Sequence, residues 1–167
     1  MGWKQVILIV SSLSALVLLY ILPTPNADYR NIQVEEKTEE NANLTNGEKI
    51  QKALKILEEG GAPMKGIMML KDVVADDPEN QEALFYLGDL SIKSGQFDKA
   101  IPRFVKLIEL NPEAAQYWFM LAQAYEKNKN NDKAVNAYQT FINFNTDSII
   151  IEDVRARIKK LKKLDIN

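Results

Sequence analysis

Cysteine and histidine are both absent from this chain of 167 residues. Their absence excludes disulfides, thiolate nucleophiles, zinc sites of the Cys/His type and every catalytic triad with an imidazole base. Paired acids such as Asp76-Asp77 fall where turns or helix ends are expected, and no base with an orienting partner accompanies them. The sequence therefore predicts a protein that is not an enzyme and that has no catalytic residues, no metal ligands and no cofactor.

An excess of charge is also missing, because 21 basic residues stand against 23 acidic ones, a net charge of -2. Binding to nucleic acid depends on many phosphate contacts from Lys and Arg. We therefore expect no nucleic-acid partner.

Only one long apolar run occurs, the 17 uncharged residues 6–22. As a helix this run is about 26 Å long, just enough to cross the hydrocarbon of a bilayer, and Pro23 ends it. The sequence predicts a transmembrane anchor over residues 1–23, embedded in the membrane through residues 6–22. A cleaved signal peptide is the alternative, although its nearest cleavage site, after Ala27, has Pro25 where a small residue is required.

The two flanks of this run differ in charge. Lys4 precedes it, whereas residues 24–46 are acidic and poor in aromatics, which predicts a flexible acidic linker that acts as a tether. The amino terminus is therefore expected in the cytoplasm, and the chain as a single-pass protein of the inner (cytoplasmic) membrane with an extracytoplasmic or periplasmic domain. Ser11 and Ala15 form a small-xxx-small pair, a spacing that lets two helices approach closely, but nothing else indicates a homo-oligomer.

Residues 81–114 contain two apolar stretches at helical spacing, separated by a polar turn in which Gly95 ends the first helix. The same layout returns 34 residues later over 115–148 and, more weakly, upstream over 47–80. Each unit predicts a short antiparallel pair of amphipathic helices. The chain is therefore expected to be a repeat protein of three such units.

The motif in these units resembles the tetratricopeptide repeat, whose pattern is W-x2-L-G-x2-Y, then A-x3-F, then P. The matches are Leu87, Gly88, Ala100, Phe104 and Pro112 in residues 81–114, and Trp118, Leu121, Tyr125, Ala134 and Tyr138 in residues 115–148. Departures that do not threaten the fold are Gly66 in place of Ala, Ala122 in place of Gly, and Pro102 inside a second helix. With the predicted anchor, the chain resembles the membrane-anchored tetratricopeptide proteins of bacteria. The resemblance implies an all-α solenoid of three helix-turn-helix repeats.

The first unit and the C-terminal segment bound this solenoid. Thr45 and Glu48 have the spacing of a capping box, which starts the first helix near residue 46. Residues 149–164 carry Ile151, Val154, Ile158 and Leu161 on one helical stripe, which predicts a capping helix that covers the last repeat. The basic residues of this helix, from Arg155 to Lys163, are expected to form a solvated face that complements the helix dipole.

In the tetratricopeptide family the first helices of successive units line a concave groove, and the resemblance implies which residues form it here. The predicted groove consists of Gln51, Lys55, Phe85, Asp89, Lys93, Phe119, Gln123 and Lys127. Because Leu84 and Trp118 are expected to lie in the inward stripe, Phe85 and Phe119 beside them are expected to have no role in the core and to contact a ligand. The Lys, Asn and Arg clamp with which some family members hold a terminal carboxylate is absent, which favours an apolar segment as the ligand.

A cluster of Met64, Met68 and Met69 on the second helix of the first unit admits two interpretations. These side chains are either filler in the packing against neighbouring helices or an adaptable contact patch. The sequence leaves both open.

Taken together, these features predict a non-catalytic, membrane-tethered interaction module. It would bind a peptide segment or a protein partner of an envelope complex in its groove, as an adaptor or assembly factor. The resemblance extends to bacterial factors that hold unfolded clients such as apocytochromes during cytochrome c biogenesis. A permanent structural subunit of a membrane complex is the alternative.

The predicted anchor can be tested by membrane fractionation. We expect the full chain to stay with the membrane after washes in high salt and alkaline carbonate, because an apolar span is not held by charge. Immunoblotting of pellet and wash measures this. Release into the wash would contradict the anchor, and a mature amino terminus near Asp28 would show that the signal peptide is the correct interpretation.

Overall fold

The computed structural model describes residues 44–60 and 62–164, and these form seven helices. The predicted anchor, the Ser11/Ala15 pair and most of the predicted linker lie outside the described residues. Within the described part no helix has the length and apolar character needed to cross a membrane. The helices are α3 (Asn46–Glu58), α4 (Pro63–Asp76), α5 (Gln81–Lys93), α6 (Phe97–Leu110), α7 (Ala115–Lys127), α8 (Asn131–Phe144) and α9 (Ser148–Leu164).

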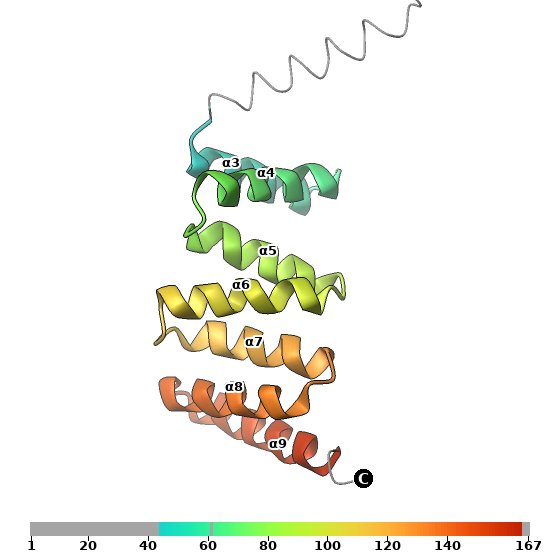
Figure 1. The fold of residues 1–167 in the computed structure, drawn as a ribbon, viewed down its shortest axis with the longest axis vertical. Coiled ribbons are helices and arrows are strands. Elements are labelled where there is room, and N and C mark those ends of the chain that lie inside the picture. Colours follow the sequence, from blue (N-terminus) through green and yellow to red (C-terminus); the bar gives the residue numbers. More distant parts are fainter. Residues whose placement is uncertain (1–43, 61, 165–167) are drawn as a thin grey trace, which may run out of the picture. The chain divides into compact units, whose positions relative to one another are not determined.

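The helices of this unit, which begins at Thr45, are stacked in chain order (Figure 1). α3 packs on α4, α5 on α6 and α7 on α8, and these hairpins are the three expected helix pairs. Contacts between α4 and α5 and between α6 and α7 join the hairpins, and α9 packs on α8. This arrangement confirms an all-helical solenoid of three repeats followed by a capping helix.

Local signals place the helix ends. Thr45 and Glu48 form a complete capping box, in which the Glu48 backbone N–H donates to Thr45 Oγ1 over 3.3 Å and the Thr45 backbone N–H donates to the Glu48 carboxylate over 2.8 Å. The Thr45 hydroxyl also donates to this carboxylate, over 2.8 Å, and the two hydrogen bonds that the carboxylate accepts from Thr45 lower the pKa of Glu48. Gly95, with φ of 72°, provides the left-handed residue after α5. At the equivalent turn after α7, Lys129 takes the same conformation with φ of 60°, although it carries a side chain.

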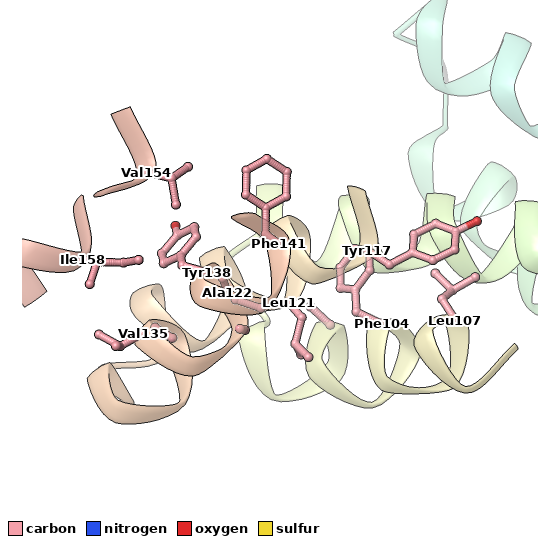
Figure 2. Close-up of a cluster of buried hydrophobic side chains, with 14 of the residues drawn as sticks. Phe104, Leu107, Tyr117, Leu121, Ala122, Val135, Tyr138, Phe141, Val154 and Ile158 are labelled. Atoms are coloured by element: carbon pink, nitrogen blue, oxygen red, sulfur yellow. The ribbon is translucent and has the colours of Figure 1, made fainter. Parts of the chain in front are cut away.

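The core follows the predicted stripes (Figure 2). Phe104 of α6 and Tyr138 of α8 are fully buried. The capping helix contributes Val154, Ile158 and Leu161, all buried in the same cluster, as its stripe predicts. Pro102 lies inside α6, which continues past it to Leu110.

One inward position differs from the prediction. Trp118 was expected in the core stripe of α7, but it is only half-buried, and its indole Nε1–H donates to the carbonyl of Pro112 over 2.8 Å. Its neighbour Tyr117 is buried instead and packs beside Phe85 of the preceding hairpin. The indole carries a polar N–H that needs an acceptor, and the nearby turn carbonyl supplies one at the surface.

Two glycines lie where an added Cβ would collide with the partner helix of the same hairpin. A Cβ on Gly88 of α5 would lie 2.7 Å from Cζ of Phe104. A Cβ on Gly66 of α4 would lie 2.8 Å from the carbonyl oxygen of Ala53 in α3. Gly66, a departure from the family pattern, is therefore required by the packing of the first hairpin.

We expect Gly88→Ala to lower the free energy of unfolding by about 1 to 3 kcal/mol, because the added methyl group overlaps the ring of the buried Phe104. Urea unfolding followed by circular dichroism measures the loss. Gly47→Ala is the control, since a Cβ there meets nothing within 4 Å and removes a helical glycine, so stability should stay equal or rise. Equal stability of the Gly88→Ala variant and the parent chain would contradict this account of the hairpin.

Candidate partner-binding site

The predicted groove residues lie on α3, α5 and α7, and on each helix they are spaced four residues apart. This spacing places the members of each set on one side of their helix. Gln51, Lys55, Lys93 and Lys127 are exposed, whereas Phe85, Asp89, Phe119 and Gln123 are half-buried. Their role in binding a partner stays a prediction.

The two phenylalanines of this set differ from what was expected. The Phe85 ring centroid lies 6.3 Å from that of Phe104 and 6.2 Å from that of Tyr117. The expectation that such residues have no role in the core is therefore wrong. In the second and third hairpins the second helix places an aromatic ring beneath the first helix, and the half-buried phenylalanine reaches that ring edge-on.

Phe119 repeats this packing one hairpin later. Its ring centroid lies 5.8 Å from that of Tyr138 and 5.1 Å from that of Phe141. Only the remaining exposed part of each phenylalanine ring is accessible to a ligand.

Charged groups of the predicted groove are paired along two of the three helices. Lys55 lies 3.9 Å from Glu59, the residue that caps the C-terminal end of α3, and Lys93 lies 2.7 Å from Asp89 within α5, both at four-residue spacing. Ion pairs of this exposed kind contribute little to stability. They do lower the net charge that the groove presents to a partner.

A hollow of about 370 Å³ lies between α7 and α9, and we call it the α7–α9 hollow. Its lining consists of Glu126, Lys127, Asp153, Ala156, Arg157 and Lys160. Lys127 therefore belongs both to the predicted groove and to this hollow. The sequence analysis assigned α9 only a capping role, so the hollow was not predicted.

A polar network forms one wall of the α7–α9 hollow. The hydroxyl of Tyr138 donates to the Glu126 carboxylate over 2.7 Å, and Arg157 donates to the same hydroxyl over 3.1 Å. Arg157 also lies 3.7 Å from Glu126. Burial raises the pKa of Tyr138 far above its usual range, and the hydrogen bond to Tyr138 raises the pKa of Arg157. Both groups therefore stay protonated at neutral pH.

This network had a sequence signal. Tyr138 occupies the position of Phe104 one repeat later, so the sequence places a hydroxyl where the preceding repeat has none. A hydroxyl at a buried position needs polar partners. Arg157 and Glu126 provide them.

Exposed apolar side chains occur at both ends of the described unit. Met64 and Met68 of α4 are 62% and 56% exposed, whereas Met69 is buried, so the packing interpretation holds only for Met69. At the other end Ile149 of α9 is 81% exposed.

Within residues 44–60 and 62–164, no group of acidic side chains is arranged to hold a metal ion.

Comparisons with known proteins agree on the repeat. Two family models described as tetratricopeptide repeat match residues 48–118 and 91–146. No curated protein matches the chain.

Three solved structures illustrate the similarity of the fold. MamA (residues 41 to the end) from Desulfovibrio magneticus RS-1 is 17% identical, with a TM-score of 0.61 over 75% of this chain and 72% of that one. MamA of strain AMB-1 is 21% identical, with a TM-score of 0.56 over 62% of this chain and 61% of that one. The first tetratricopeptide domain of Spaghetti (RPAP3), bound to the HSP90 peptide SRMEEVD, is 13% identical, with a TM-score of 0.61 over 71% of this chain and 91% of that one. At these identities the similarity is one of fold.

The packing of Phe119 generates a prediction about stability. We expect Phe119→Ala to lower the free energy of unfolding by about 2 kcal/mol, because the ring loses its contacts with Tyr138 and Phe141. Denaturant unfolding measures this. Gln116→Ala, at an exposed position of the same helix, should change stability by less than about 0.5 kcal/mol. If both variants unfold like the parent chain, Phe119 is free of the core after all.

Proposed function

We propose that this protein is a non-catalytic protein–protein interaction module, because its chain contains tetratricopeptide repeats between residues 48 and 146. Its ligand is a peptide segment of a partner protein, held on the predicted groove of α3, α5 and α7. The chemistry of that surface suits a peptide, because aromatic ring edges alternate with amide and charged side chains.

The observation that carries this proposal is the recurrence of one helix face in two successive repeats. Phe85 and Phe119 occupy equivalent positions 34 residues apart, and each ring is partly buried and partly accessible. Four residues after them, Asp89 and Gln123 are half-buried polar groups beside the rings. A face that repeats rings and polar groups at one helical spacing is suited to an extended or helical segment that crosses several helices.

The peptide-bound RPAP3 domain supports this mode of binding by analogy of fold, since nearly all of that domain aligns with this chain. The residues that hold its peptide are not carried over, because the identity is low.

Tethering is the second part of the proposal. Residues 6–22 anchor the protein in the cytoplasmic membrane, and the acidic linker over residues 24–46 lets the repeat domain reach partners on the extracytoplasmic side. An anchor raises the effective concentration of the groove near other membrane proteins. The protein would then act as an adaptor or assembly factor of an envelope complex, in the manner of the factors that hold clients in cytochrome c biogenesis.

A permanent structural subunit is the second candidate, and the exposed methionines favour it. Met64 and Met68 lie on α4, outside the predicted groove, and adaptable thioether side chains are common at protein interfaces. A fixed complex would cover them.

The two candidates are distinguished by photocrosslinking in the native membrane. A photoreactive amino acid at Gln51 or Gln123 should crosslink one contiguous segment of one partner, because both side chains lie on the predicted groove. Mass spectrometry of the crosslinked peptides identifies the segment. The same group at the exposed Lys71 of α4 is the control and should give no such product.

The photoreactive amino acid is also placed at Met68. Crosslinks from that position alone, in a complex of constant stoichiometry, would favour the structural subunit. Crosslinks from none of these positions would contradict both candidates.

A further inference from the structure

The α7–α9 hollow extends the predicted groove beyond the three repeats. Lys127 ends the row of groove residues on α7, and the facing wall comes from α9. Asp153, Ala156 and Lys160 follow one another at spacings of three and four residues, so they lie on one side of α9, and the exposed Ile149 precedes Asp153 by four. A segment that crosses α3, α5 and α7 therefore reaches α9 at this hollow.

Two of the charges in the hollow cancel one another. The Glu126 carboxylate accepts a hydrogen bond from Tyr138 and lies beside Arg157, which itself donates to the Tyr138 hydroxyl. Because Tyr138 is fully buried, this arrangement is held by the core. Neither Glu126 nor Arg157 contributes net charge to a ligand.

The remaining lysines are not neutralised in this way. Lys127 is the repeat equivalent of Lys93, but Gln123 stands where Asp89 pairs with Lys93 over 2.7 Å. Across residues 44–60 and 62–164, neither Lys127 nor Lys160 has an ion pair or a hydrogen bond through its side chain. Asp153 is the one other acid in the lining, so two lysines and one carboxylate leave a net positive charge.

We infer that the α7–α9 hollow is a subsite for a carboxylate of the bound peptide, held by Lys127 and Lys160. The inference rests on the proposed function, and it adds the chemistry of the ligand: the partner segment carries Asp, Glu or its own terminal carboxylate where it crosses from α7 to α9. A single carboxylate suits the hollow better than a polyanion, because Asp153 in the lining repels further negative charge. The exposed Ile149 on the same side of α9 suits an apolar residue of the segment next to that acid.

A peptide-display selection on the full-length chain in a mild nonionic detergent tests this inference. Short random peptides selected on the parent chain should be enriched in Asp or Glu at one position. The enrichment should disappear with the double variant Lys127→Gln, Lys160→Gln. It should persist with Lys159→Gln, which removes one positive charge from an exposed residue of α9 that neighbours Lys160 but does not line the hollow.

Fluorescence anisotropy makes the test quantitative. It measures the affinities of the best acidic peptide and of a neutral peptide in which Asn or Gln replaces the acid. The double variant should weaken the acidic peptide about tenfold more than it weakens the neutral peptide, as expected for the loss of two partly exposed ion pairs. Gln123→Asp should weaken it about threefold, because it recreates beside Lys127 the pair that Asp89 forms with Lys93. Unchanged circular dichroism spectra and melting temperatures show that the variants are folded.

Three results would overturn the inference. Enriched peptides without an acidic position, or equal weakening by Lys159→Gln, would exclude the carboxylate subsite and leave the proposed function standing. No enrichment of any peptide would contradict the proposed function and the subsite together.

Discussion

The close approach of the two helices in each hairpin is the constraint on which the rest of this structure depends. At Gly88 the ring of Phe104 occupies the space that a Cβ would need, and at Gly66 the Ala53 carbonyl does so. The first hairpin has Leu54 where the others have Gly88 and Ala122, and it has Gly66 where they have Ala100 and Ala134. A small residue is thus always present at the crossing, but it can come from either helix. When the two helices of a hairpin are packed this closely, the first helix of the next repeat can pack against their outer face. The stack therefore extends by one repeat at a time.

The third repeat differs from the second at two positions that together change the surface. Replacing the phenyl ring of Phe104 by the phenol of Tyr138 places a hydroxyl at the edge of the core, and that hydroxyl binds Glu126 of α7 and Arg157 of α9. Replacing Asp89 by Gln123 removes the carboxylate that neutralises the lysine four residues later. The first change attaches the capping helix to the last hairpin through polar contacts as well as apolar ones. The second leaves that end of the predicted groove positively charged.

The capping helix therefore has two faces with separate roles. Its apolar stripe of Val154, Ile158 and Leu161 covers α8, as a solenoid end requires. Its other side shares the α7–α9 hollow with the last groove helix. The same residues could not do both, since a buried stripe is unavailable to a ligand and a charged face cannot be buried without a partner.

The sequence by itself determined the period of 34 residues, the helix pairs, the caps at Thr45 and Gly95 and the apolar stripe of each helix. These features depend on neighbours within a few residues, which a linear pattern records. Only the tertiary structure decided the exposure of residues at the boundary of a stripe, such as Phe85, Phe119 and Trp118, because their burial depends on the size of side chains one helix away. The α7–α9 hollow was likewise decided only by the tertiary structure. Its charges come from residues about 30 positions apart, and the hydroxyl that orients two of them comes from α8, which lies between α7 and α9 in the sequence.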